Sequence, residues 1–192
     1  MHRPLTKLTP RQLGRVLNQR KAVGLVIALF LIIAIAVLDR GVNLFPVDDD
    51  WHRYHGQRFE VMRVIDGDTI ELRSPDGERA TTRVRLWGVD TPEMGNPGRN
   101  TPPEAFAVEA TEFTTRKTRG QYVRVHLQQH RLRGQYGRLL AYIELPNGRV
   151  LNAELIKNGL SEHDARWGHD QVEHYDRLEQ RAREARKGIW GP

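Results

Sequence analysis

Alternating apolar and polar positions predict short β-strands in the middle of the chain. Runs at 59–65, 69–72 and 81–86 are rich in β-branched and other apolar residues, and a Ser-Pro-Asp-Gly turn separates the second run from the third. Two more runs follow at 122–127 and 139–145, and the last ends in a Pro-Asn-Gly turn that is typical of a hairpin. The pattern therefore predicts five strands.

Helical spacing predicts three helices around these strands. One begins near Thr101, where the spacing is that of a capping box, and continues to Gly120. A short helix covers 152–158, and a final one has apolar residues at helical intervals over 172–185 and ends at Gly188. Five strands with three helices favour an α+β fold built on a five-stranded β-barrel of the oligonucleotide-binding (OB-fold) type.

An uninterrupted apolar run of 17 residues, 22–38, lies near the N-terminus between Lys21 and Asp39. A helix of this length rises about 26 Å, which is within the range of segments that span a bilayer. We expect an uncleaved transmembrane helix, because the basic flank at 1–21 is long for a signal peptide. A signal peptide cleaved near Ala36 and a buried core helix are the alternatives.

The net charge of +6 at first suggests a polyanionic partner, but its location changes that view. Residues 1–21 hold six basic and no acidic side chains, whereas 41–192 balance 23 Lys and Arg against 23 Asp and Glu. The basic flank is therefore expected to stay in the cytoplasm, with the rest of the chain on the far side of the membrane. Because cysteine is absent, disulfides, thiolate zinc sites and a nucleophilic thiol are excluded.

These patterns divide the chain into four parts. A basic cytoplasmic flank covers 1–21, the transmembrane signal-anchor 22–38 and a linker 39–58, which has three consecutive Asp residues and few apolar ones. The folded domain is expected over 59–190.

Two acidic motifs follow predicted strands. Ile-Asp-Gly-Asp-Thr at 65–69 lies between the first two strands, and Asp-Thr-Pro-Glu at 90–93 follows the third. Either motif alone is typical of a turn. If the three strands are neighbours, Asp68 and Asp90 can converge at one end of the sheet, and two carboxylates there need a cation to relieve their repulsion. Ca²⁺ or Mg²⁺ is the natural occupant.

Two arginines accompany these carboxylates. Arg85 lies on the third predicted strand, and Arg138 lies at the start of the fifth. A surface position is the usual one for arginine. Beside a metal ion and a carboxylate, however, two guanidinium groups match phosphodiester hydrolysis, because they can hold and neutralise the phosphate while a carboxylate assists the attack of water.

The chain resembles the staphylococcal nuclease (thermonuclease-like) family over about 59–190. The motifs that carry the resemblance are VIDGDT at 64–69, RLWGVDTPE at 85–93, PEA at 103–105, YGRLLAY at 136–142, NAEL at 152–155 and GIW at 188–190. The resemblance implies an OB-fold barrel with three helices. It also implies Ca²⁺-dependent hydrolysis of DNA and RNA that breaks the bond to the 5′ oxygen and leaves 3′-phosphate ends.

The resemblance further implies a metal shell and a base. Asp68 and Asp90 would bind calcium through their carboxylates and Thr91 through its backbone carbonyl. Asp66 would support this shell. Glu93 would act as the general base or orient the attacking water.

The substrate contacts that the resemblance implies are less complete. Arg85 and Arg138 would bind the phosphate and stabilise the transition state, and Tyr136 would lie beside a nucleotide phosphate. The charged pair that precedes this tyrosine in the family type is replaced by Gly-Gln at 134–135. Two tyrosines of the nucleotide pocket appear here as an alanine and Trp167, which could stack on a base or pack in the core.

Three histidines crowd the segment 163–174, which leads into the last helix. The spacings between His163, His169 and His174 are six and five residues, which do not match the i, i+4 arrangement of a helical zinc site. Surface or capping roles are favoured.

The leading hypothesis is a membrane-anchored, extracytoplasmic, calcium-dependent nuclease that acts on DNA and RNA. The alternative from another class is a non-catalytic OB-type module, held at the membrane, that binds nucleic acid or protein without cutting it. No protein partner is inferred, and a monomer is expected.

Overall fold

The computed structural model describes residues 29–31, 34 and 49–192. The predicted transmembrane helix at 22–38 falls mostly outside the described residues. Within those residues, no helix combines the length and the apolar character that a membrane span requires. Residues 49–192 form a compact unit of their own.

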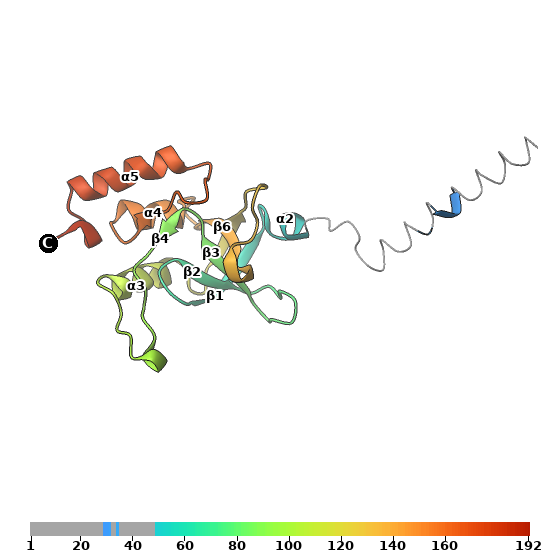
Figure 1. The fold of residues 1–192 in the computed structure, drawn as a ribbon, viewed down its shortest axis with the longest axis horizontal. Helices are drawn as coiled ribbons and strands as arrows, with labels where there is room; N and C mark the ends of the chain where they lie inside the picture. The colour runs from blue at the N-terminus through green and yellow to red at the C-terminus, as the bar shows by residue number, and fades with distance from the viewer. Residues whose placement is uncertain (1–28, 32–33, 35–48) are drawn as a thin grey trace, which may run out of the picture. The chain divides into compact units, whose positions relative to one another are not determined.

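Five strands close into a barrel in the order β1-β2-β3-β6-β5, which confirms the predicted fold class (Figure 1). The strands are β1 (Arg58–Val64), β2 (Thr69–Leu72), β3 (Thr82–Leu86), β5 (Tyr122–His126) and β6 (Leu139–Glu144). Neighbouring strands pair antiparallel, except that β3 and β6 run parallel. The parallel pair places Arg85 opposite Leu140, so Arg138, two residues earlier than Leu140, lies alongside β3.

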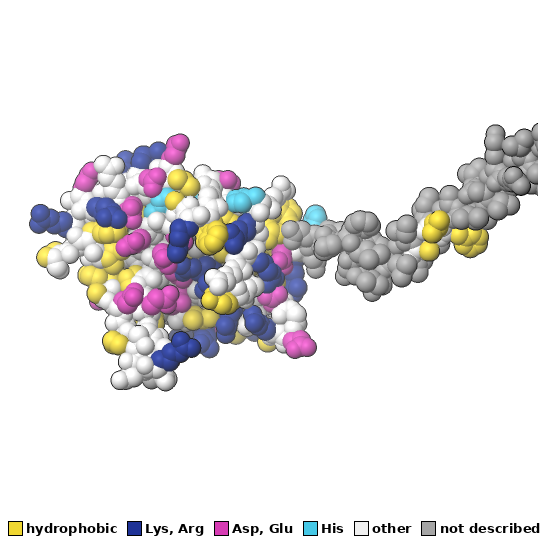
Figure 2. Space-filling model, viewed as in Figure 1, with side chains coloured by type: hydrophobic (Ala, Val, Ile, Leu, Met, Phe, Trp, Pro, Cys, Tyr) yellow, Lys and Arg dark blue, Asp and Glu magenta, His cyan; other side chains and the backbone are white. Residues whose placement is uncertain are grey.

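The alternation that predicts the strands also builds the barrel interior. On β3, Thr82, Val84 and Leu86 are buried, whereas Arg83 is exposed and Arg85 is partly buried. On β6, Leu139, Ala141 and Ile143 are buried with the same period of two, and Tyr142 on the opposite face is buried as well. Charges of both signs are interspersed on the visible face of this unit (Figure 2), as expected for the balanced composition of 41–192.

Three main helices pack around the barrel, as predicted. They are α3 (Ala107–Thr118), α4 (Leu151–Lys157) and α5 (Val172–Glu184). In Figure 1, α4 and α5 lie together on one side, and α3 covers another side, where it contacts β1. The first helix begins later than Thr101, because the chain reaches it through Phe106 in the left-handed conformation, at φ 66°.

An additional helix, α2 (Asp49–Tyr54), lies within the segment 39–58 that the sequence analysis assigns to a linker. The Tyr54 side chain is fully buried, and its hydroxyl forms a 2.8 Å hydrogen bond with the hydroxyl of Thr82. Trp51 also packs against the core. The folded unit therefore starts at Asp49, before the predicted residue 59.

A second, two-stranded sheet connects the barrel to the last helix. It consists of β4 (Val89–Asp90) and β7 (Glu162–His163), which pair antiparallel. Asn152 at the start of α4 supports this arrangement: it is fully buried, donates to the carbonyl oxygens of Trp87 and Ala141, and accepts the backbone N–H of Ile143.

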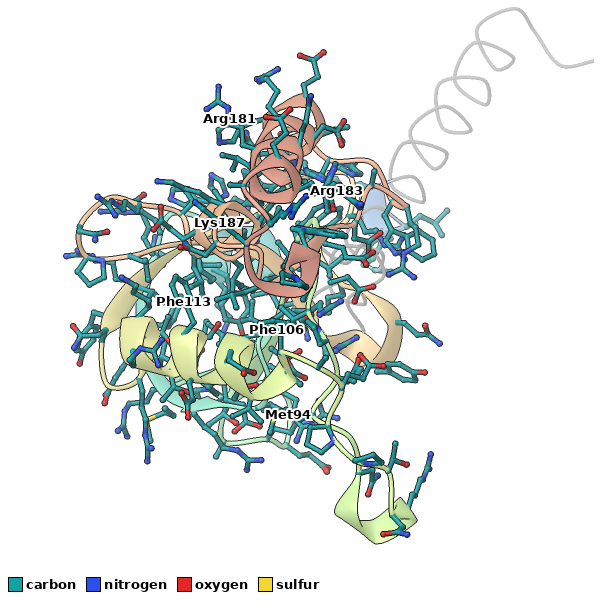
Figure 3. All side chains as sticks on the ribbon, turned by 90° about the vertical axis from the view of Figure 1, so that its left-hand side faces the viewer. Met94, Phe106, Phe113, Arg181, Arg183 and Lys187 are labelled. Atoms are coloured by element: carbon teal, nitrogen blue, oxygen red, sulfur yellow. The ribbon has the colours of Figure 1, made fainter. Side chains whose placement is uncertain are left out.

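The C-terminal turn η3 (Gly188–Trp190) docks on the end of α4 through two glycines. Gly159 has φ +67°, and a Cβ atom there would lie 2.2 Å from the carbonyl oxygen of Lys187. The close approach allows the N–H of Ile189 to donate to the Gly159 carbonyl at 2.8 Å. Arg183 at the end of α5 (Figure 3) lies 3.5 Å from the ring centroid of Trp190.

Candidate active site

Two acidic side chains meet at one end of the barrel. Asp68 directly precedes β2, Asp90 ends β4, and Arg85 on β3 is the register partner of Thr69. The Arg85 guanidinium pairs with both carboxylates: its Nη1 contacts Asp68, and its Nη2 donates to Oδ1 of Asp90 at 2.7 Å. Because β2 and β3 are neighbours, the structure brings these three side chains together.

Asp68 is held in a fixed position by donors on both of its oxygens. Only 3% of the residue is exposed. The backbone N–H and the hydroxyl of Thr91 both donate to Oδ2 at 3.0 Å, and the Thr69 hydroxyl donates to Oδ1 at 3.1 Å. A buried carboxylate needs such partners to offset its loss of hydration.

A hydrogen bond from α3 holds the loop before β2 in place. Asp66 accepts the backbone N–H of Asp68 at 3.1 Å, and the Thr114 hydroxyl on α3 donates to the carbonyl oxygen of Gly67 at 2.6 Å. Burial raises the pKa of the Asp66 carboxyl, although a hydrogen bond from Thr69 opposes this shift. The helix therefore fixes the acidic loop against the barrel.

The oxygen atoms available as metal ligands at this end of the barrel fit a hard cation such as calcium. Asp68, Asp90 and Thr91 offer carboxylate and carbonyl oxygens, which are the ligands that Ca²⁺ prefers. The positive charge of Arg85 lies between the two carboxylates and offsets one of their two negative charges. Within the described part of the chain, no three His, Asp or Glu side chains are arranged to hold a metal ion, so carbonyl oxygens and water would complete the shell.

Glu93 is exposed in a neighbouring hollow of about 510 Å³, which Asp90 and Thr91 also line. Its backbone is fixed by Glu104: the Glu104 carboxylate accepts the N–H of Glu93 at 2.9 Å, and the Glu104 N–H donates to the Glu93 carbonyl at 3.0 Å. The capping-box spacing that starts at Thr101 predicts that Glu104 caps a helix. The structure uses it instead to hold the segment that carries Glu93.

Arg85 and Arg138 both line a pocket of about 160 Å³ beside this hollow. The Nη1 of Arg138 has one long contact, 3.5 Å, with the hydroxyl of Thr69. Its Nε is buried and has no hydrogen-bond partner among the described residues. A buried guanidinium N–H without a partner can donate to an anion that enters the pocket.

Two further arginines line the same pocket, and sequence reasoning missed both. Arg166 binds the Asp164 carboxylate in a bidentate manner, at 2.7 and 2.8 Å, and also donates to Oδ2 of Asp90 at 3.0 Å. Burial acts to raise the pKa of Asp164, but the hydrogen bonds from Arg166 leave it below its ordinary value. Nothing in the local sequence distinguishes Arg166 or Arg131 from a surface arginine.

The two aromatic residues proposed for substrate contact are both exposed near this pocket. Trp167 is 60% exposed, and the guanidinium of Arg131 lies 4.2 Å from its ring centroid. Trp167 therefore does not pack in the core, which was the alternative. Tyr136 is 76% exposed, and its ring lies 5.9 Å from the Arg138 guanidinium.

Comparisons with known proteins agree with this geometry. The family described as "Staphylococcal nuclease homologue" matches residues 83–192. The chain is 37% identical to a thermonuclease of Staphylococcus hyicus over 137 residues, which cover 70% of this chain and 76% of the relative. It is 41% identical to a thermonuclease of Staphylococcus intermedius over 106 residues, which cover 55% and 59%.

The chain belongs to the staphylococcal nuclease family. A micrococcal nuclease of Shigella flexneri is also similar, at 30% identity over 148 residues, which cover 73% of this chain and 75% of the relative. The protein is thus a thermonuclease-like nuclease, as the resemblance in the motifs implied.

Two histidines of this nuclease, His163 and His169, form a buried hydrogen-bonded chain, so the predicted surface role is wrong for them. The predicted capping role fits His169, which accepts the N–H of Gln171 at the start of α5. The N–H of Gln171 donates to Nδ1 of His169 at 3.2 Å, so the proton of a neutral His169 lies on Nε2. That Nε2–H donates to Nε2 of His163 at 2.8 Å, and Nδ1–H of His163 donates to Asp176 at 2.6 Å. The Tyr142 hydroxyl donates to Nδ1 of His169 at 3.0 Å. This series of hydrogen bonds therefore requires a neutral His169.

We expect the stability of this nuclease to fall as the pH decreases from 6.5 to 4. Burial lowers the pKa of His169 from 6.5 to about 4. Above pH 6.5 His169 is neutral in both states. Between these values the unfolded state binds a proton that the folded state does not, so the free energy of unfolding should fall by up to about 1.4 kcal/mol per pH unit. Urea denaturation at several pH values measures this slope.

The matched variants are His169→Gln and His174→Gln, because His174 is exposed on α5. The slope that remains in His169→Gln should be smaller than in the wild type, whereas His174→Gln should keep the wild-type slope. Equal slopes in the wild type and His169→Gln would contradict the assignment.

Proposed function

We propose that this nuclease hydrolyses phosphodiester bonds of DNA and RNA with calcium and leaves 3′-phosphate ends. The observation that carries the proposal is the shared position of Arg85, which contacts both Asp68 and Asp90 and also lines the pocket with Arg138. An anion-binding pocket thus adjoins a pair of oxygen ligands. This combination is the one that phosphodiester hydrolysis requires.

Calcium would be held by the carboxylates of Asp68 and Asp90 and the carbonyl of Thr91, with Asp66 behind them. When bound, the ion supplies positive charge that neutralises the phosphate and the two carboxylates. Arg85 and Arg138 hold the phosphate through bidentate N–H donors and stabilise the charge that develops on its oxygens.

Glu93 completes the reaction as the general base. Its exposed carboxylate takes a proton from the attacking water as the new bond from oxygen to phosphorus forms. The bond from phosphorus to the 5′ oxygen breaks, and that oxygen is protonated from solvent. The phosphate stays on the 3′ side of the cut. Trp167, with Arg131 beneath it, would stack on a base, and Tyr136 would contact the nucleotide phosphate.

We also propose that the nuclease is anchored in a membrane with its folded unit outside the cytoplasm. What supports this is the apolar run at 22–38 and the six basic side chains before it. Secretion after cleavage near Ala36 is the alternative. The N-terminal sequence and the mass of the protein recovered from membranes and from medium distinguish the two, because only cleavage removes residues 1–36.

The proposed activity is tested with the full chain, single- and double-stranded DNA, and RNA, in Ca²⁺ or in chelator. We expect cleavage that requires calcium and products that end in 3′-phosphate. Glu93→Ala should lower kcat about 10²-fold, the usual loss when a general base is removed. Glu173→Ala is the matched control, because the Glu173 side chain is 91% exposed on α5 and should leave kcat unchanged.

The second candidate function, a non-catalytic binding module, makes a different prediction in the same experiment. It requires binding of nucleic acid without turnover and without dependence on Asp68 or Asp90. Metal-independent binding with no cleavage, or full activity in Glu93→Ala, would refute the catalytic proposal.

A further inference from the structure

Arg133 joins three separate segments through one guanidinium group. Nε and Nη2 donate to the two carboxylate oxygens of Asp50 at 2.5 and 2.7 Å, and Nη1 and Nη2 donate to those of Asp76 at 2.8 and 3.0 Å. Nη1 also donates to the carbonyl oxygen of Gly137 at 2.7 Å. An arginine side chain has five N–H groups, and all five are used here.

The two carboxylates that hold Arg133 belong to firmly placed elements. Asp50 lies on α2, which is anchored in the core by the buried Tyr54. Asp76 lies in the turn between β2 and β3, where its backbone exchanges hydrogen bonds with Arg79 at 3.0 and 3.1 Å. The side chains of Arg133, Asp50 and Asp76 are 29%, 19% and 17% exposed, so these ion pairs are partly shielded from solvent.

The third contact of Arg133 lies directly before the phosphate-binding arginine. Gly137 precedes Arg138, and the N–H of Gly134 donates back to the Arg138 carbonyl at 2.9 Å. The loop closes where Leu140 donates to the carbonyl of Leu132 at 2.8 Å. Arg133 is thus the side chain that fixes the backbone of Arg138 to α2 and to the β2–β3 turn.

The Arg138 side chain has few contacts of its own that would fix it. Its Nη1 has the 3.5 Å contact with Thr69, and its Nε has no partner among the described residues. The position of its guanidinium therefore depends on the backbone to which it is attached. Stabilising a transition state requires donors that are already in place, and a displacement of about 1 Å can cost 10²-fold in rate.

We propose that Arg133 is a positioning residue for hydrolysis: it holds the loop 133–138 so that Arg138 meets the phosphate. The inference rests on the proposed function of Arg138. It also gives α2 a role in the reaction, because the carboxylate of Asp50 supplies two of the five contacts of Arg133.

The test compares Arg133→Met and Arg133→Lys in the full chain. We expect both to lower kcat about tenfold or more, with a smaller change in KM, since the transition state loses its donor. Lysine should not rescue the rate, because it has three rotatable donors and cannot bridge two carboxylates and a carbonyl. The control is Arg53→Ala. Arg53 lies on α2, the helix that carries Asp50, and donates to the Pro75 carbonyl. This variant should leave kcat unchanged.

A double variant separates positioning from general destabilisation. If Arg133 acts through Arg138, Arg133→Met should lower kcat no further in an Arg138→Ala background. Hydrogen exchange at the amide of Gly134 should be at least about tenfold faster in Arg133→Met but unchanged in Arg53→Ala. Wild-type kcat in Arg133→Met, or an equal loss of kcat with and without Arg138, overturns the inference. A wild-type chain that does not cut nucleic acid refutes the proposed function instead, and the exchange rates still test the loop contact.

Discussion

Replacing Arg85 with alanine is expected to lower kcat about 10³-fold or more and, without calcium, to lower the free energy of unfolding by about 3 to 5 kcal/mol. The rate should fall because one transition-state donor is worth about 10² to 10³ in this kind of site, and the same side chain also lines the pocket beside the carboxylates. The stability should fall because the 3%-exposed Asp68 would lose its ion pair inside the protein.

Arg83→Ala is the matched control for this variant. Arg83 lies two residues earlier on β3, faces outward and forms a 3.0 Å ion pair with Glu71, with 48% of its side chain exposed. Arg83 is half-exposed, although its partner Glu71 is only 12% exposed, so Arg83→Ala should leave kcat unchanged and lower the free energy of unfolding by about 1 kcal/mol, less than Arg85→Ala. Steady-state kinetics with calcium and urea denaturation without it measure the two effects. Equal changes of kcat and of the free energy of unfolding in the two variants would contradict the role of Arg85 in the site.

Gly159→Ala is expected to lower the free energy of unfolding by about 3 to 4 kcal/mol. A Cβ atom at this position would lie 2.2 Å from the Lys187 carbonyl, and the backbone φ of +67° is unfavourable for alanine. The C-terminal turn would have to leave the end of α4, with loss of the hydrogen bond from Ile189 to Gly159. Thermal or urea denaturation measures the loss.

Gly148→Ala separates the clash from the backbone conformation. Gly148 has a similar φ of +77°, but nothing lies within 4 Å of its added Cβ atom. We expect it to cost about 1 kcal/mol, the usual difference between alanine and glycine in the left-handed region. If both variants lower the free energy of unfolding by the same amount, the close approach of Gly159 to Lys187 does not explain the effect of Gly159→Ala.

The sequence was sufficient to predict those parts of the fold that depend on local pattern. Alternation along 81–86 predicts β3, and the neighbouring runs predict its antiparallel partner. Once β2 and β3 are adjacent, the convergence of Asp68 and Asp90 near Arg85 follows from their positions at the strand ends. The alternation of buried and exposed residues and the positions of the turns are therefore enough to predict that Asp68, Asp90 and Arg85 lie together.

Features that depend on contacts across the fold could not be predicted in this way. The three consecutive Asp residues at 48–50 suggest a solvated spacer, although the last two lie in α2 and Tyr54 of the same helix is buried in the core. The buried chain of His169 and His163 forms only because β7 pairs with β4 and α5 packs beside it. Arg133 meets Asp50 and Asp76, and Arg166 meets Asp90, only when the barrel and the small sheet close, and the spacing along the chain does not indicate these distant partners.

The parallel pairing of β3 with β6 has a consequence for when the enzyme can first act. Arg85 and Arg138 are far apart along the chain and meet only after β6 has joined β3. Contacts between distant segments form slowly, because a long loop must close before they gain any energy. A growing chain that ends before Leu139 has no completed barrel and lacks the ordered loop that carries the second arginine. Because the two arginines are not yet brought together in such an unfinished chain, we expect it to be unable to hydrolyse nucleic acid.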